Sequence, residues 1–147
     1  MQDLNQLCQL LNDDYGINRG GCCYITYLIA KNLDRLHIPY KLVIFDRYPK
    51  DIKAIKKELY KQRFHRTYYK SITGIHSCSH YCLQIGENLI NATDYSEFYK
   101  YVISDINAKH ILWIYKHGVW NNDYNIRNNL TVKRIINNYF KNEEKTR

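Results

Sequence analysis

The chain has 147 residues, 45% of them hydrophobic, and a formal net charge of +8. This length and composition exclude a disordered chain and predict a single domain over residues 1–140, followed by a frayed tail at 141–147. No basic stretch followed by an apolar run opens the chain, and no window approaches the roughly 18 apolar residues of a membrane span, so we expect a cytoplasmic protein that does not contact a membrane.

The first half of the chain predicts helices around one buried strand. Apolar residues at helical spacing predict a helix over 3–12, which a glycine-containing loop over 13–21 follows. A longer apolar stripe predicts a second helix over 22–36, and this helix opens on two cysteines. The β-rich segment 40–45 predicts a central strand, and Asp51 is placed to cap a third helix.

The second half predicts a β-hairpin followed by further elements. Alternating polar and apolar residues over 75–85 and 89–94 predict two antiparallel strands. A three-residue turn between them would place His80 opposite Asp94, whereas a two-residue turn would bring Asn91 onto the face of the histidine instead. The remaining elements are expected as a short helix over 96–107, a strand over 109–116 and a last helix from Thr131.

The two cysteines that open the second helix indicate thiol chemistry. A helix N-terminus offers unpaired N–H groups and the positive end of the helix dipole, and both lower the pKa of a thiol. Cys22 falls on the apolar stripe and is expected to pack in the core, whereas Cys23 lies about 100° around the helix and is expected to face a cleft. The alternative is that both are ordinary buried residues. All five cysteines are expected to be free thiols, because their number is odd and no C-x-x-C pair occurs.

The order of a helix-opening cysteine, a strand, a strand histidine, a hairpin and a carboxylate resembles the papain-like fold and, within it, the transglutaminase-like superfamily. The segment Gly21-Cys22-Cys23 is similar to the G-x-C of that family, and the run from Arg19 to Cys23 resembles the R-G-G-x-C motif of arylamine N-acetyltransferases. The resemblance covers about half of the chain. It implies an α+β fold in which N-terminal helices, including a core helix that bears the nucleophile, pack on a mainly antiparallel sheet.

By this resemblance Cys23 would be the nucleophile, His80 the general base and later acid, and Asp94 the group that orients the imidazole. Asn18 is a candidate oxyanion donor and Asn91 the alternative orienting residue, since Asp94 is also placed to cap a helix. The implied activity is peptide or isopeptide hydrolysis, or acyl transfer, through a thioester formed with a peptide or protein substrate. No cofactor is expected.

A basic segment over residues 47–70 supports a different interpretation. It carries most of the positive excess, and its patch consists of Lys53, Lys56, Lys57, Lys61 and Arg63. Such a patch can attract nucleic acid or an acidic protein, so the alternative function is a binding module without chemistry, although a charge run is more often a solvated helix face.

A zinc site is a further alternative, because histidines and cysteines alternate along one predicted strand. Their positions are 76, 78, 80 and 82. Four ligands along one extended strand span about 20 Å and cannot surround one ion, although two of them could join Cys22 or Cys23. We therefore expect no metal.

Overall fold

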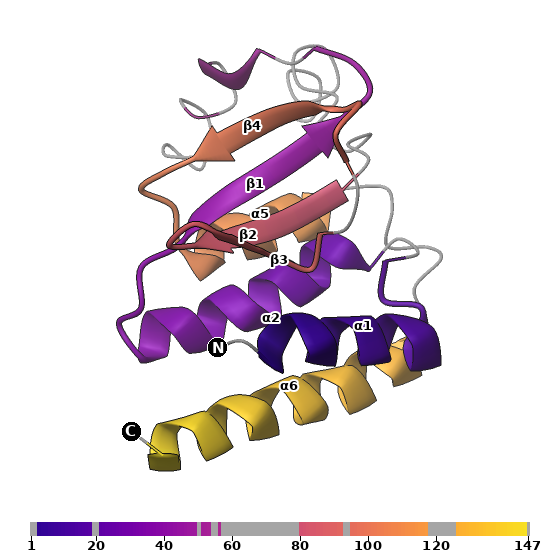
Figure 1. Ribbon diagram of the computed structural model, residues 1–147, viewed down its shortest axis with the longest axis vertical. Coiled ribbons are helices and arrows are strands. Elements are labelled where there is room, and N and C mark those ends of the chain that lie inside the picture. Colours follow the sequence, from indigo (N-terminus) through magenta and orange to yellow (C-terminus); the bar gives the residue numbers. More distant parts are fainter. Residues whose placement is uncertain are drawn as a thin grey trace.

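The computed structural model describes residues 3–18, 21–49, 51–53, 56, 80–92, 95–117 and 126–146. The elements with defined bounds are α1 (Asp3–Tyr15), α2 (Cys22–Arg35), β1 (Lys41–Asp46), β2 (His80–Ile85), β3 (Asn88–Ile90), β4 (Tyr99–Ile103), α5 (Ala108–His117) and α6 (Ile126–Thr146). The fold is therefore α+β, as the sequence predicts (Figure 1). Among the described residues, no helix has the length and apolar character needed to cross a membrane.

The sheet is antiparallel throughout, in the order β3-β2-β1-β4. Strand β1 pairs with β2 on one side and β4 on the other, and its last five residues are buried. The prediction of a central strand in this segment is confirmed. In this register Phe45 pairs with His80, so the first residue of β2 lies beside the end of β1.

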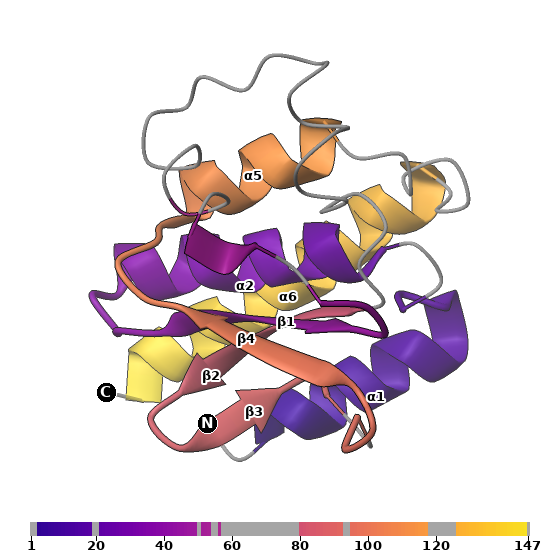
Figure 2. The same ribbon diagram turned by 90° about the horizontal axis from the view of Figure 1, so that it is seen from above.

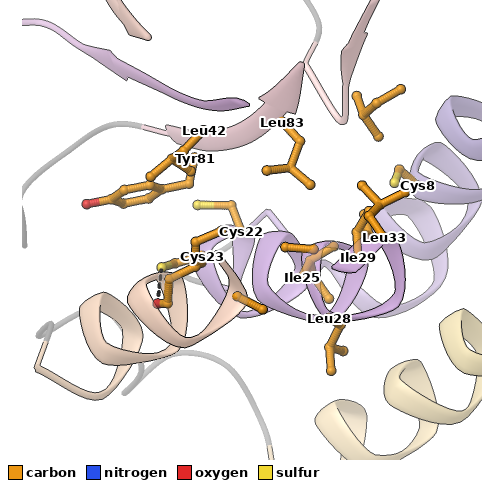
Figure 3. Packing of buried hydrophobic residues seen from close by; sticks show 14 of the residues in the cluster. Cys8, Cys22, Cys23, Ile25, Leu28, Ile29, Leu33, Leu42, Tyr81 and Leu83 are labelled. Carbon is orange, nitrogen blue, oxygen red and sulfur yellow. Dashed lines mark hydrogen bonds between the residues drawn. The ribbon is translucent and has the colours of Figure 1, made fainter. Parts of the chain in front are cut away.

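Helix α2 is the centre of the molecule. It packs against β2 on one side and against α5 and α6 on others, while α1 contacts β3 and α6 (Figure 2). The face of α2 toward the sheet belongs to one buried cluster, of which Figure 3 labels Ile25, Ile29, Leu33, Leu42, Tyr81 and Leu83. The opposite face of the sheet is also covered, by a second cluster built on Val43, Phe45 and Cys82.

Two predicted elements in the second half of the chain are wrong. Residues 99–103 form the edge strand β4 where a short helix was expected, and residues 108–117 form helix α5 where a strand was expected. A short apolar run fits either structure, and here Ile111 and Ile114, three residues apart, are the fully buried ones. Helix α6 also begins earlier than expected and runs on through residues 141–146, which were expected as a frayed tail.

The hairpin has the shorter of the two turns that the sequence allows. Ile85 pairs with Asn88, so only Gly86 and Glu87 connect the strands, and Gly86 has a φ of 60°. This register places Asn91 on the same face as His80, as expected for a two-residue turn. The pairing of His80 with Asp94 was expected only for a three-residue turn, which the hairpin does not have. Asp94 itself lies outside the described residues.

Several sequence predictions fall on segments outside the described residues. Positions 52, 53 and 56 are helical, where the third helix was expected, but most of that helix and the start of the strand expected at 75–85 are not described. The patch residues Lys57, Lys61 and Arg63 lie outside as well, while Lys53 is exposed and Lys56 is half-buried.

Candidate functional site

The two helix-opening cysteines point in different directions, and both are buried: Cys22 packs in the core as expected, whereas Cys23, which was expected to face a cleft, is buried as well. Cys23 is fully buried, and its thiol lies 3.9 Å from the carbonyl oxygen of Ile111 on α5. Cys22, which is 9% exposed, lies on the side of α2 that faces Tyr81 of β2 (Figure 3). Cys23 therefore packs against a helix that the sequence predicted as a strand.

Opposing effects act on the Cys22 thiol. Burial is the larger effect and raises its pKa, while backbone hydrogen bonds from Tyr81, Cys23 and Cys22 itself lower it. These neighbouring backbone groups favour the thiolate, but less strongly than burial disfavours it. The expected fall in pKa at this helix start is not met at Cys22, because desolvation outweighs these groups, and the thiol is neutral in the free protein.

Thr26 attaches the start of α2 to β2. Its hydroxyl lies 2.7 Å from the carbonyl oxygen of Cys22 and 3.2 Å from that of Tyr81. Because Thr26 is one helical turn beyond Cys22 and is itself buried, this contact holds the first turn of α2 against the strand. The cysteine and the strand therefore keep a defined separation.

His80 is a buried imidazole with a defined tautomer. Its side chain is 1% exposed, and its ring stacks on that of Tyr95 with the ring centroids 4.8 Å apart. Its Nε2 lies 2.5 Å from the carbonyl oxygen of Asn91. A carbonyl only accepts hydrogen bonds, so Nε2 carries the proton and Nδ1 has the free lone pair. Burial lowers the pKa of His80 more than the Asn91 carbonyl raises it, so the ring is neutral at neutral pH and Nδ1 is available as a base.

Asn91 and Asn18, both candidates from the sequence, lie together beside His80. Their side-chain amides bond to each other in both directions, at 3.2 Å and 3.0 Å. Asn91 therefore meets the imidazole through its backbone carbonyl, whereas the sequence reasoning assigned its side chain to that role. Asn18 is committed to Asn91 and is not directed at the cysteines, so the structure gives no support to its assignment as an oxyanion donor.

Sequence reasoning missed two further asparagines that complete this arrangement. Asn5 accepts the backbone N–H of Asn91 at 2.8 Å, and Asn12 accepts the backbone N–H of Asn18 at 3.0 Å. Both lie on α1, where the pattern shows only a polar helix face. No local signal marks them, because their partners are distant in sequence.

The thiol and the imidazole lie at the same end of β2, but on opposite faces of it. Side chains alternate along a strand, so Tyr81 points toward α2 while His80 points away. Burial raises the pKa of Tyr95, the residue stacked on His80, and a negative charge on Cys22 would raise it further. Within the described part of the chain, no hydrogen bond joins Cys22 and His80.

Metal binding gains no support from the described residues, which contain no group of three or more His, Cys, Asp or Glu close enough to hold an ion. Burial raises the pKa of Cys82 to about 12, and a metal ligand must be a thiolate. Residues 76 and 78, the other members of the proposed set, lie outside the described segments.

A basic groove occurs where the sequence did not suggest one. It lies between α2 and α6, has a volume of about 380 Å³, and is lined by Lys31, Asn32, Arg35, Asn137, Lys141 and Glu144. Arg35 and Glu144 form an ion pair of 2.7 Å across it. The groove is on the side of α2 away from His80, so it is separate from the thiol–imidazole site.

The candidate site thus comprises a neutral thiol at the start of α2, a neutral imidazole at the start of β2, and the Asn91 peptide that holds the imidazole. Its residues come from α1, α2, β2 and the segment after β3. No family model, curated protein or solved structure matches the chain, so the case for a function rests on these residues.

Proposed function

We propose that this chain is a cysteine-dependent enzyme that acts on an amide or thioester carbonyl, with a thiol at the start of α2 as nucleophile and His80 as general base. The observation that carries the proposal is the tautomer of His80. A buried, neutral imidazole with its Nε2 proton held by a carbonyl presents Nδ1 as a base. The helix-opening thiol lies at the same end of β2, on the opposite face of the strand.

The first step starts from a neutral thiol and a neutral His80 imidazole. As the sulfur attacks the carbonyl carbon, the thiol proton passes to Nδ1 of His80, and the carbonyl π-electrons move to the oxygen. Collapse of this tetrahedral intermediate expels the amine or thiol, which takes the proton from the imidazolium, and a thioester remains. Water or an acceptor amine then attacks the thioester and gives its proton to His80, and His80 passes this proton to the departing sulfur, which restores the neutral thiol and imidazole. The backbone N–H groups at the start of α2 are the candidate donors to the oxyanion.

The geometry favours Cys22 over Cys23 as the nucleophile. The sulfur of Cys22 borders β2, whereas that of Cys23 is directed at Ile111 on α5. The resemblance in the motif points to Cys23, which remains the second candidate. Cys22 and His80 lie on opposite faces of β2, so the proposed proton transfer requires the start of β2 to rearrange when substrate binds.

The test is acylation by p-nitrophenyl acetate, followed by intact-mass and peptide mass spectrometry. We expect one acetyl adduct on wild-type protein and on the control variant Cys8→Ala, no adduct on Cys22→Ala, and slow formation on His80→Gln. An adduct that disappears only in Cys23→Ala would move the nucleophile to Cys23. Acylation that does not depend on His80 would refute the enzyme proposal.

The rival function, a basic binding module, has a separate signature. Binding of a short DNA duplex that weakens steeply with added salt, and that Cys22→Ala and His80→Gln leave unchanged, would favour it. The described residues that would contribute are Lys53 and Lys56, together with the groove between α2 and α6. Lys53→Gln combined with Lys56→Gln tests the first region, and Lys31→Gln combined with Lys141→Gln tests the second.

A further inference from the structure

Asn91 has a backbone conformation that side chains seldom adopt. Its φ is 63°, in the left-handed region, where asparagine is among the few residues other than glycine that occur with any frequency. It is 9% exposed and directly follows β3. This conformation turns the Asn91 carbonyl toward the ring of His80.

Each polar group of Asn91 has a different partner. The carbonyl accepts from Nε2 of His80, the backbone N–H donates to Oδ1 of Asn5 at 2.8 Å, and the side-chain amide pairs with Asn18. The side-chain amide of Asn91 therefore bonds to Asn18 and not to the imidazole. If Asn91 relaxed to an extended conformation, its carbonyl would turn away from His80.

Two side chains hold this peptide from different elements. Asn5, on α1, accepts from the Asn91 N–H and donates to the carbonyl oxygen of Leu89 at 2.9 Å, so it spans the end of β3. Asn18, in the loop before α2, has its own N–H held by Asn12 of α1. Helix α1 thus supports both contacts to Asn91.

We propose that Asn5 and Asn18 are positioning residues that lock Asn91 in its left-handed conformation, so that the backbone carbonyl of Asn91, and not its side chain, selects the base-competent tautomer of His80. The catalytic consequence rests on the proposed function, but the tautomer itself does not. Without the hydrogen bonds to Asn5 and Asn18, the Asn91 carbonyl turns away from Nε2, and the ring proton distributes between the two nitrogens of His80. The acylation rate should then fall by about tenfold, the rate equivalent of one hydrogen bond.

Substitutions on both sides of the Asn91–Asn18 amide pair test the positioning. Asn91→Gly keeps the carbonyl and tolerates the positive φ but deletes the same amide pair as Asn18→Ala, so it should give mixed tautomers to a similar extent. Asn5→Ala and Asn18→Ala should each give mixed tautomers, whereas Asn5→Asp keeps an acceptor for the Asn91 N–H and should preserve the wild-type state. Asn137→Ala is the matched control, because it deletes an amide–amide bond to Asn32 on the far side of α2.

The measurement is the pair of ¹⁵N chemical shifts of the His80 ring, with acetylation by p-nitrophenyl acetate as the second readout. A wild-type tautomer in Asn91→Gly, which lacks the amide pair with Asn18, would show that this pair does not hold the Asn91 carbonyl, and would overturn the proposal. An unchanged tautomer in the Asn5→Ala, Asn18→Ala double variant would also overturn it. If the tautomer shifts as expected but no variant or wild-type protein is acetylated, the positioning holds and the proposed enzyme function fails. A shifted tautomer with wild-type acetylation rates would refute the catalytic part alone.

Discussion

Two buried thiols outside the candidate site should make the protein unstable in alkali. Cys8 lies on α1 and Cys82 on β2, each is 1% exposed, and burial raises the pKa of each thiol from 9.0 to about 12. The folded state therefore keeps both thiols protonated under conditions in which the unfolded chain ionises them.

The sign and size of the effect follow from linkage. Because the folded pKa is the higher one, the stabilisation is fully present below the unfolded pKa of 9.0 and is lost as pH rises through the interval up to about 12. At about pH 10, the unfolded thiol is mostly ionised and the folded thiol is not, which lowers the free energy of unfolding by about 1.4 kcal/mol per thiol. Cys8 and Cys82 together account for about 3 kcal/mol.

The assay is urea unfolding under reducing conditions at about pH 8 and about pH 10. At about pH 8, Cys8→Ala and Cys82→Ala should each be less stable than wild type, because each substitution leaves a cavity. Between about pH 8 and about pH 10, however, the free energy of unfolding of each variant should fall by about 1.4 kcal/mol less than that of wild type, because one titrating thiol is absent. Leu11→Ala, a buried and non-titrating neighbour on α1, is the control and should keep the full wild-type pH dependence. If the cysteine variants lose as much stability as wild type, the reasoning from burial is refuted.

Two other predictions concern the imidazole and the start of α5. Burial lowers the pKa of His80 below its unfolded value near 6.5, so its contribution to stability is present above that pH and is lost as the pH falls through the folded pKa. The urea midpoint should therefore fall less between neutral and acidic pH in His80→Gln than in wild type, and an equal fall would contradict this. Asp34 accepts a hydrogen bond from the backbone N–H of Ala108, at the start of α5, at 2.9 Å. Asp34→Ala should therefore lower the free energy of unfolding, measured by thermal unfolding, by about 1 kcal/mol, whereas Asp34→Asn should lower it little. Equal stability of wild type and both variants would show that this contact does not cap α5.

The sequence by itself determined the elements whose side-chain periodicity is decisive. The apolar stripes of α1 and α2 have a helical period over several turns, and the run at 41–46 is too short and too β-branched or aromatic for a helix of that kind. The sequence also placed two cysteines at the start of a helix and His80 on a strand. These features are local, so local patterns predict them.

Tertiary contacts decided the remaining elements. The run at 108–117 is apolar enough for either a strand or a helix, and it is a helix because Ile111 and Ile114 pack together against α2. The edge strand β4 forms because β1 offers it a free side to pair with. In both cases the partner that selects the structure is distant in the chain, so propensity alone could not choose.

The chemistry of the candidate site depended most on tertiary structure. The sequence identified Cys22, Cys23, His80 and Asn91, but only the packing of α5 shows which sulfur faces β2, and only the two-residue hairpin turn brings Asn91 to the histidine. Its carbonyl, and not its amide, meets His80 because side chains from α1 and the following loop hold the Asn91 peptide from outside the hairpin. Residue types and their spacing were readable from the sequence, whereas the direction in which each group points was set by long-range contacts.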